Sequence, residues 1–294
     1  MAAAHTEKPV LSGAASDTAP QFFIYPYGAP PAGIPAENLK VLLLIRHSQG
    51  ACPARCSWRP SPPLHPALPL PPPLPTLPGT HNIAVAKSGG TDGGLEEPEY
   101  KNEAWADARL TPFGEEQSAT LQGVLAGLPH PELVLVSPLS RTIQTALIAF
   151  AAAASPVRMV SEELIRERNG AHPCDRRRAV TALRADFPGV DFSALTETDE
   201  TWTPAREPWE RTVGRASAFL HRLAALPQRT VAAVTHNDFL QALLLEAPEL
   251  RAMDPALRRT FKNAECMPLY FVHGEVLAGG EPLSAKEPHS SPRA

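Results

Sequence analysis

Short apolar runs of strand length alternate along the chain with longer segments in which apolar residues recur every three or four positions. The strand-length runs are 41–45, 133–136, 157–160 and 230–234. The helix-length segments are 111–127, 138–153, 208–226 and 239–245. Runs that are apolar at successive positions are typical of strands buried on both faces of a parallel sheet. The alternation predicts an α/β fold, a three-layer α/β/α sandwich around a central, mostly parallel sheet.

The helix predicted at 111–127 has the clearest start. Thr111 suits the capping position, Pro112 suits the first helical position, and Glu115 and Glu116 place negative charge in the first turn. We therefore expect this helix to begin directly after Thr111.

The two ends of the chain lack the pattern of the interior. Residues 1–37 are rich in Ala, Gly and Pro and predict a flexible N-terminal tail. The polar residues 284–294 predict a disordered C-terminal tail. One domain is expected at 38–283, closed by a terminal hairpin or edge strands at 267–272 and 276–277. The aromatic residues through which the N-terminal tail would dock are Phe22, Phe23, Tyr25 and Tyr27.

A proline-rich segment at 51–79 interrupts the domain. It holds 11 of the chain's 34 prolines and no acidic residue. Because proline fixes φ and lacks an N–H donor, we expect an exposed polyproline-like loop. Two interpretations stay open. Residues 69–75 present a polyproline ligand to an SH3- or WW-type domain, or the segment is a passive loop or the product of a retained intron or a gene-model error.

Charge and cysteine content narrow the expected partners and compartment. The net charge of −4 gives no broad basic field, so neither nucleic acid nor a membrane surface is an expected partner. Four cysteines are too few for the disulfide framework of a secreted domain and favour a cytoplasmic protein. Import into an organelle stays an alternative, although residues 1–20 contain Glu7 and Asp17 and no arginine, unlike a typical transit peptide.

Chemically reactive side chains follow each predicted strand, and the carboxyl ends of parallel strands meet at one edge of a sheet. In chain order these residues are Arg46, His47, Ser137, Arg141, Glu163, Glu167 and His236. Guanidinium groups bind phosphate oxygens, a neutral imidazole attacks phosphorus, and a carboxylic acid of raised pKa protonates the leaving oxygen. The sequence therefore predicts a phosphoryl-transfer site at this edge.

Cofactor and metal sites are not expected. The glycines at 89–94 neither follow a predicted strand nor open a helix, so they do not form a nucleotide-binding loop. Cys52, Cys56, His65 and His81 lack the paired Cys-x-x-Cys spacing of structural zinc sites.

Several motifs in the same order make the chain resemble the histidine phosphatase superfamily, with its phosphoglycerate mutase-like fold. Residues 46–50 resemble the start of the family's Arg-His-Gly-x-x-x-x-Asn motif, with Ser48 in place of glycine. Without residues 51–79, Asn82 lies six positions after His47, as in that motif. Three further segments resemble the family's Leu-Thr-x-x-Gly, Ser-Pro-x-x-Arg-x-x-Gln-Thr-Ala and second-histidine motifs: residues 110–114, 137–146 and 235–240.

The resemblance implies a metal-independent phosphatase that hydrolyses a small phosphorylated metabolite through a phosphohistidine intermediate on His47. It implies that Arg46 and Arg141 bind the phosphate, that His236 is a further phosphate ligand, and that Asn82 is a weaker phosphate contact.

Two carboxylates are candidates for the proton donor, and we choose Glu167 over Glu163. The block 172–177 that follows resembles a eukaryotic phosphatase-like branch of the family more than the glycolytic mutases. The alternatives are phosphoglycerate mutase-type transfer and a catalytically impaired scaffold that presents its proline-rich loop to a partner.

Overall fold

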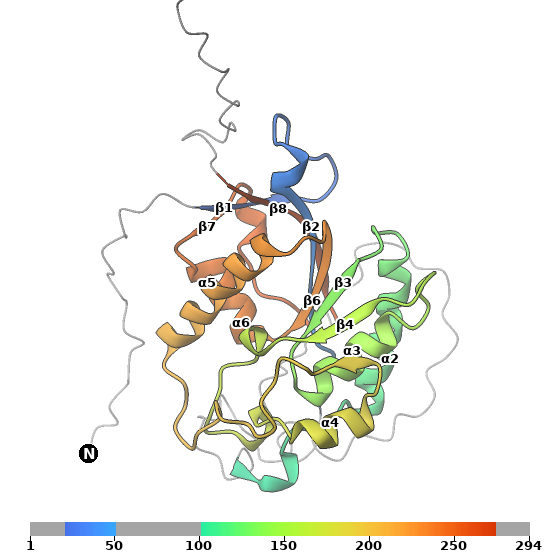
Figure 1. The fold of residues 1–294 in the computed structure, drawn as a ribbon, viewed down its shortest axis with the longest axis vertical. Helices are drawn as coiled ribbons and strands as arrows, with labels where there is room; N and C mark the ends of the chain where they lie inside the picture. Colours follow the sequence, from blue (N-terminus) through green and yellow to red (C-terminus); the bar gives the residue numbers. More distant parts are fainter. Residues whose placement is uncertain (1–20, 51–100, 275–294) are drawn as a thin grey trace, which may run out of the picture.

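An eight-stranded sheet runs through the middle of the computed structural model, which describes residues 21–50 and 101–274 (Figure 1). The strands are β1 (Phe22–Pro26), β2 (Leu39–Arg46), β3 (Leu133–Val136), β4 (Arg158–Ser161), β5 (Val190–Asp191), β6 (Thr230–Thr235), β7 (Leu250–Ala252) and β8 (Cys266–His273). Their order in the sheet is β5-β4-β3-β6-β2-β8-β1-β7. Within it, β8 alone is antiparallel to its neighbours, β2 and β1. The prediction of a mostly parallel sheet is confirmed.

Helices cover both faces of this sheet, as Figure 1 shows. On one face lie α2 (Pro112–Leu125), α3 (Ser140–Ala149) and α4 (Val180–Asp186). On the other face lie α5 (Trp209–Ala225) and α6 (Asn237–Gln241), which continues as the π-helical turn η6 (Ala242–Glu246). Short 3₁₀ turns complete the described elements: η1 (Ala36–Asn38), η3 (Glu103–Trp105), η4 (Glu163–Ile165), η5 (Pro173–Asp175) and η7 (Pro255–Leu257). The predicted three-layer sandwich is confirmed.

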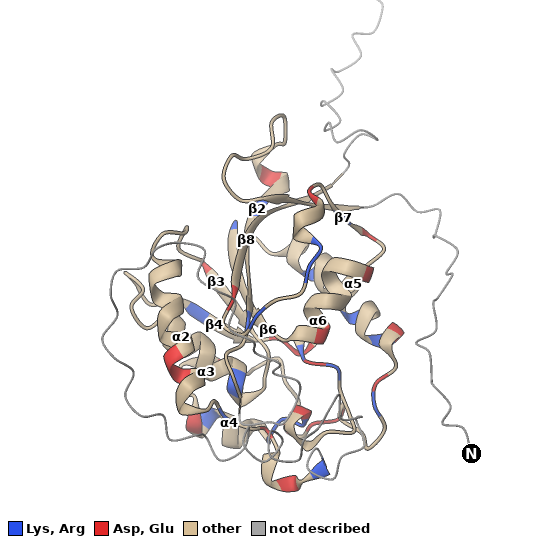
Figure 2. Cartoon of the chain, turned by 180° about the vertical axis from the view of Figure 1, so that it is seen from behind, with Lys and Arg blue, Asp and Glu red and all other residues tan. Residues whose placement is uncertain are grey.

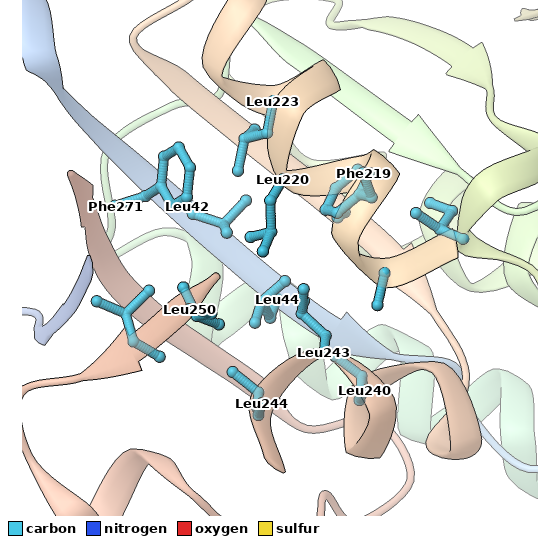
Figure 3. Packing of buried hydrophobic residues seen from close by; sticks show 14 of the residues in the cluster. Leu42, Leu44, Phe219, Leu220, Leu223, Leu240, Leu243, Leu244, Leu250 and Phe271 are labelled. Carbon is cyan, nitrogen blue, oxygen red and sulfur yellow. The ribbon is translucent and has the colours of Figure 1, made fainter. Parts of the chain in front are cut away.

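Because helices cover both faces of the sheet, β2 is apolar at successive positions. Successive side chains of a strand point to opposite faces. Leu42 and Leu44 accordingly lie in one hydrophobic core, and Leu43 and Ile45 lie in the other. Figure 3 shows the first core, in which α5 and the α6–η6 segment contribute Phe219, Leu220, Leu223, Leu240 and Leu243.

The helix predictions agree with the structure apart from small shifts at the ends. The helix expected at 111–127 is α2, and the Oγ1 of Thr111 accepts a hydrogen bond of 3.0 Å from the Gly114 N–H. The segments 138–153 and 208–226 correspond to α3 and α5, which are slightly shorter.

The prediction of a flexible tail over 1–37 is wrong for Phe22–Pro26, which form β1. This strand pairs with β7 on one side and β8 on the other, and Phe22 and Ile24 enter the core. Both pairing partners lie more than 200 residues away in sequence, so a local sequence pattern does not predict this strand. Residues 1–20 lie outside the described part of the chain.

The prediction of edge strands or a hairpin near the C-terminus is also wrong for β8. Its hydrogen-bonded neighbours are β2 and β1, so it is an interior strand. The partner expected at 276–277 lies outside the described residues, as do the proline-rich segment 51–79 and the C-terminal residues 284–294. None of the helices in the described ranges is long and apolar enough to cross a membrane.

Candidate active site

The carboxyl ends of β2, β6 and β3 bring three of the predicted site residues together. These strands are parallel neighbours, so the residues that follow them lie at one edge of the sheet. His47 follows β2 and His236 follows β6, and the centroids of their rings are 4.8 Å apart. Arg141 lies in the first turn of α3, after β3, and its Nη2 is 3.2 Å from His236 Nδ1. Charged segments of both signs surround this end of the sheet, near α4 (Figure 2).

His47 is held as a neutral imidazole with one defined tautomer. Its Nδ1 is 2.6 Å from the carbonyl oxygen of Ser48, which can only accept, so Nδ1 carries the proton. Burial, and then the charges of Arg141 and Arg46, keep the pKa of His47 well below its ordinary value. The other ring nitrogen, Nε2, is therefore left with its lone pair, which is the form that a nucleophile needs.

The loop after His47 is fixed by α2 and α3. The Ser48 N–H donates to the hydroxyl of Thr145 at 3.1 Å, and the hydroxyl groups of Ser48 and Ser118 are 2.7 Å apart. The Gln49 N–H donates to the side chain of Gln117 at 2.9 Å. Ser48, which stands where the family motif has glycine, thus has a hydroxyl partner inside the protein.

His236 is also neutral. Its Nδ1 accepts from the Arg141 guanidinium, so its Nε2 carries the proton and donates to the Ser137 hydroxyl at 2.7 Å. Burial, followed by the charge of Arg141, lowers the pKa of His236 well below its ordinary value. Two neutral imidazoles therefore lie side by side, beside a permanent cation.

The guanidinium of Arg141 is anchored by two neighbouring residues. Its Nη1 donates to the carbonyl oxygen of Cys174 at 2.7 Å, and its Nη2 donates to Asp175 Oδ1 at 3.0 Å. The other carboxylate oxygen of Asp175 accepts from Arg206 Nη1 at 2.7 Å. Burial alone would raise the pKa of Asp175, but the hydrogen bond from His172 and the charges of the two arginines hold it well below its usual range.

Arg46 is the last residue of β2 and supplies a second guanidinium beside His47. Its Nη1 donates to the Phe261 carbonyl. Its buried Nε–H has no hydrogen-bond partner among the described residues. A bound anion would provide that partner, because buried donors are nearly always hydrogen-bonded.

Glu167 lies beside the start of α6. Its Oε1 accepts from the N–H groups of Arg168 and Asp238, each at 3.0 Å. Burial, and then the like charges of Asp238 and Asp175, raise the pKa of Glu167 to about 8. The carboxyl group is therefore largely protonated at neutral pH and can donate a proton.

Glu163 lies in a different setting, although it also follows β4. Its carboxylate is bound by Arg166 Nη1 at 3.0 Å and by Arg177 Nε at 2.6 Å. Both carboxylate oxygens of Glu163 are therefore engaged in ion pairs with guanidinium groups. The choice of Glu167 over Glu163 as the proton donor stays a prediction.

Other site residues were missed or cannot be placed. Asn82 lies outside the described residues. Asp238 follows His236 closely, and Asp175 lies in the block that resembles the phosphatase-like branch, so both had a signal in the sequence. Arg206 had none, because it lies on a loop that only the fold brings to Asp175.

An open pocket of about 530 Å³ lies next to this centre. Its wall includes Lys101, His172, Trp202 and Arg206, and two of these, His172 and Arg206, contact Asp175. Within residues 21–50 and 101–274, no three His, Cys, Asp or Glu side chains gather where they could hold a metal ion.

The sequence is similar to those of known proteins. The family model of the histidine phosphatase superfamily (branch 1) matches residues 95–276. A phosphoglycerate mutase-like protein of Arabidopsis thaliana is 35% identical over 197 residues, which are 56% of this chain and 70% of that protein. Phosphoglycerate mutase-like protein 1 of the same plant is 33% identical over 193 residues, which are 55% of this chain and 66% of that protein. The chain thus spans about two thirds of the length of these relatives.

Two solved structures are similar over most of their length. Phosphoglycerate mutase from Bacillus anthracis is 16% identical with a TM-score of 0.44, covering 83% of this chain and 94% of that one. A mycobacterial glucosyl-3-phosphoglycerate phosphatase is 20% identical with a TM-score of 0.39, covering 79% of this chain and 90% of that one.

Proposed function

The chain belongs to the histidine phosphatase superfamily, and we propose that it is a metal-independent phosphomonoesterase that hydrolyses a small phosphorylated metabolite through a phosphohistidine on His47. The observation that carries this proposal is the hydrogen bond from His47 Nδ1 to the Ser48 carbonyl. It leaves Nε2 of a neutral imidazole as the nucleophile, next to two guanidinium groups.

In the first step, Arg46 and Arg141 bind the phosphate oxygens, and the neutral His236 is a further ligand of the phosphate. His47 Nε2 attacks phosphorus in line, and the bond between phosphorus and the ester oxygen breaks. Guanidinium groups speed such a transfer because they stabilise charge on the phosphoryl oxygens in the transition state. The leaving oxygen takes the proton of Glu167, whose raised pKa keeps that proton available near neutral pH.

In the second step, water attacks the phosphohistidine. The Glu167 carboxylate, ionised by the first step, accepts a proton from that water, and the bond between phosphorus and Nε2 breaks. Inorganic phosphate leaves, and His47 and Glu167 return to their starting protonation states.

The leaving group is proposed to lie toward the pocket beside the site. Arg206 lines that pocket, and its Nη2 is 3.8 Å from the Asp238 carboxylate, whose own N–H binds Glu167. Arg206 and Asp238 thus connect the pocket wall to the proposed proton donor.

The test is phosphate release from p-nitrophenyl phosphate between pH 4 and pH 8 without added metal. We expect activity in the intact chain and a fall of at least about a thousandfold in His47→Ala, because the covalent route is then closed. Protein quenched in an alkaline denaturant should carry a phosphoryl group that is stable in base, labile in acid and absent from His47→Ala. Undiminished activity in His47→Ala would contradict the proposal.

Two further assays separate the alternatives. Mutase-type transfer would appear as isomerisation of 3-phosphoglycerate, primed with the bisphosphate, without net release of phosphate. The alternative of a catalytically impaired scaffold is tested with a chain that lacks residues 51–79. Activity in that version alone would mean that the proline-rich segment disables the enzyme.

A further inference from the structure

Asp175 is a buried carboxylate placed between two arginines at the edge of the candidate phosphate site. We propose that Asp175 is a positioning residue, which holds the guanidinium of Arg141 in the orientation that binds the transferred phosphoryl group. The inference rests on the proposed function and deepens it, because it assigns a role to a residue outside the group expected to touch the phosphate.

The contacts of Arg141 show how its orientation is set. Both terminal nitrogens donate to one dipeptide, Nη1 to the Cys174 carbonyl and Nη2 to the Asp175 carboxylate, at 2.7 and 3.0 Å. Two bonds from a planar fork to adjacent acceptors fix the plane of the guanidinium as well as its location. Without the Asp175 carboxylate, the guanidinium would keep its bonds to the Cys174 carbonyl and the neutral His236 ring but lose the charged acceptor that orients Nη2.

Further hydrogen bonds hold the backbone of the segment that contains Cys174 and Asp175. Arg166, whose side chain is fully buried, donates through Nη2 to the Asp175 carbonyl at 2.7 Å. The Trp202 indole N–H donates to the His172 carbonyl at 3.0 Å. The backbone at Asp175 is therefore held by hydrogen bonds, so its carboxylate can preorganise the Arg141 guanidinium.

A purely stabilising role explains the arrangement less well. The side chains of Arg141 and Asp175 are each 5% exposed. A buried ion pair often contributes little net stability, because removing two charges from water offsets their attraction. The pair is instead placed where orientation matters, since Arg141 Nη2 also lies 3.2 Å from His236 Nδ1, next to His47.

The first experiment measures orthovanadate binding by titration calorimetry, using the full-length chain. Asp175→Ala should weaken the affinity at least about tenfold, because Arg141 loses the carboxylate that orients its Nη2. The control is Asp191→Ala, which removes a carboxylate of the edge strand β5 that is paired with Arg158. The control should stay within about twofold of the wild type. Wild-type affinity in Asp175→Ala would overturn the inference.

A double-mutant cycle then tests whether Asp175 acts through Arg141. In an Arg141→Ala background, Asp175→Ala should change the orthovanadate affinity by less than about twofold. If the two losses multiply, Asp175 acts independently of Arg141 and the inference is wrong.

A charge-conserving variant covers the case in which Asp175→Ala does not fold. Asp175→Glu keeps the negative charge between Arg141 and Arg206 but lengthens the side chain by one methylene group. We expect the orthovanadate affinity to fall at least about fivefold because the guanidinium is displaced. Wild-type affinity in this variant would also overturn the inference.

The pH profile supplies a readout that a merely structural role would not move. The charged groups that act on Glu167 are Asp238 of α6, Asp175 of η5, Arg141 of α3 and Arg206 of the loop before α5. Removing the Asp175 charge lowers the pKa of Glu167. The fall of kcat at alkaline pH should then begin at lower pH in Asp175→Ala than in the wild type.

The two proposals fail in different ways. If the wild type hydrolyses p-nitrophenyl phosphate through His47 but Asp175→Ala binds orthovanadate normally, only the positioning role is overturned. If the wild type neither hydrolyses the ester nor binds orthovanadate, the proposed function is overturned, and the positioning role with it.

Discussion

Glu163 and Glu167 have the same side chain and follow the same strand, yet their surroundings differ. Glu163 is paired with Arg166 and Arg177. Glu167 instead accepts hydrogen bonds from two backbone N–H groups and is affected by the charges of Asp238 and Asp175. At the scale of single residues, burial and the neighbouring carboxylates allow Glu167 to hold a proton at neutral pH.

The raised pKa of Glu167 predicts an alkaline limb in the activity. For an alkyl phosphate, whose leaving oxygen needs a proton, kcat should fall as the pH rises through about 8, because Glu167 then loses its proton. Glu167→Gln should reduce kcat by about a hundredfold or more at neutral pH. The measurement is kcat against pH for an alkyl phosphate and for p-nitrophenyl phosphate, which has a good leaving group. A fall of equal size for both esters would contradict the role as acid.

At the scale of elements, the start of α2 holds the loop that carries His47. The Thr111 N–H donates to the Gln49 carbonyl at 3.1 Å. A Cβ on Gly114 would lie 2.1 Å from that same carbonyl oxygen. The helix can approach the loop this closely because position 114 has no side chain.

Gly114→Ala should therefore displace the loop after β2. We expect a loss of stability of about 1 to 3 kcal/mol and a fall of at least about tenfold in kcat/KM. Gly123→Ala is the matched control on α2, since nothing lies within 4 Å of its added Cβ. It should stabilise the protein by up to about 1 kcal/mol, because alanine is the better helix former. Urea denaturation and steady-state kinetics test both variants, and equal behaviour of the two would refute this account of α2.

At the scale of the whole molecule, the sheet separates two hydrophobic cores, and β2 contributes side chains to both. Leu44 lies in the core of α5 and α6, and Leu43 lies in the core of α2 and α3. Both side chains are fully buried. Neither face is therefore dispensable for holding β2 and the His47 that follows it.

Leu43→Ala and Leu44→Ala should each destabilise the protein by about 2 to 5 kcal/mol, the usual cost of a cavity in a packed core. Val124→Ala, at a side chain that is 50% exposed on α2, should change stability by less than about 0.5 kcal/mol. Urea denaturation measures all three. A small effect at either leucine would show that its face of the sheet is loosely packed.

Features that depend on short stretches of chain follow from the amino-acid sequence alone. The double-sided apolar run of β2, the cap of α2 at Thr111 and the order of strands and helices all follow from local periodicity and local hydrogen bonding. The sequence also places three site residues at one edge of the sheet, because His47 and His236 directly follow recognisable strands and Arg141 lies in the helical turn after another. Their roles in catalysis stay predictions.

Features that depend on distant partners arise only in the folded chain. β1 and β8 take their places from pairings across most of the chain, which a local pattern does not encode. The link from Arg141 to Asp175 and on to Arg206 joins three separate segments. Likewise, the difference between Glu163 and Glu167 arises from charges that folding brings near. Long-range pairing and the electrostatic surroundings of buried groups exist only once the chain has folded, and this is why the sequence could propose the reacting residues but not what positions them.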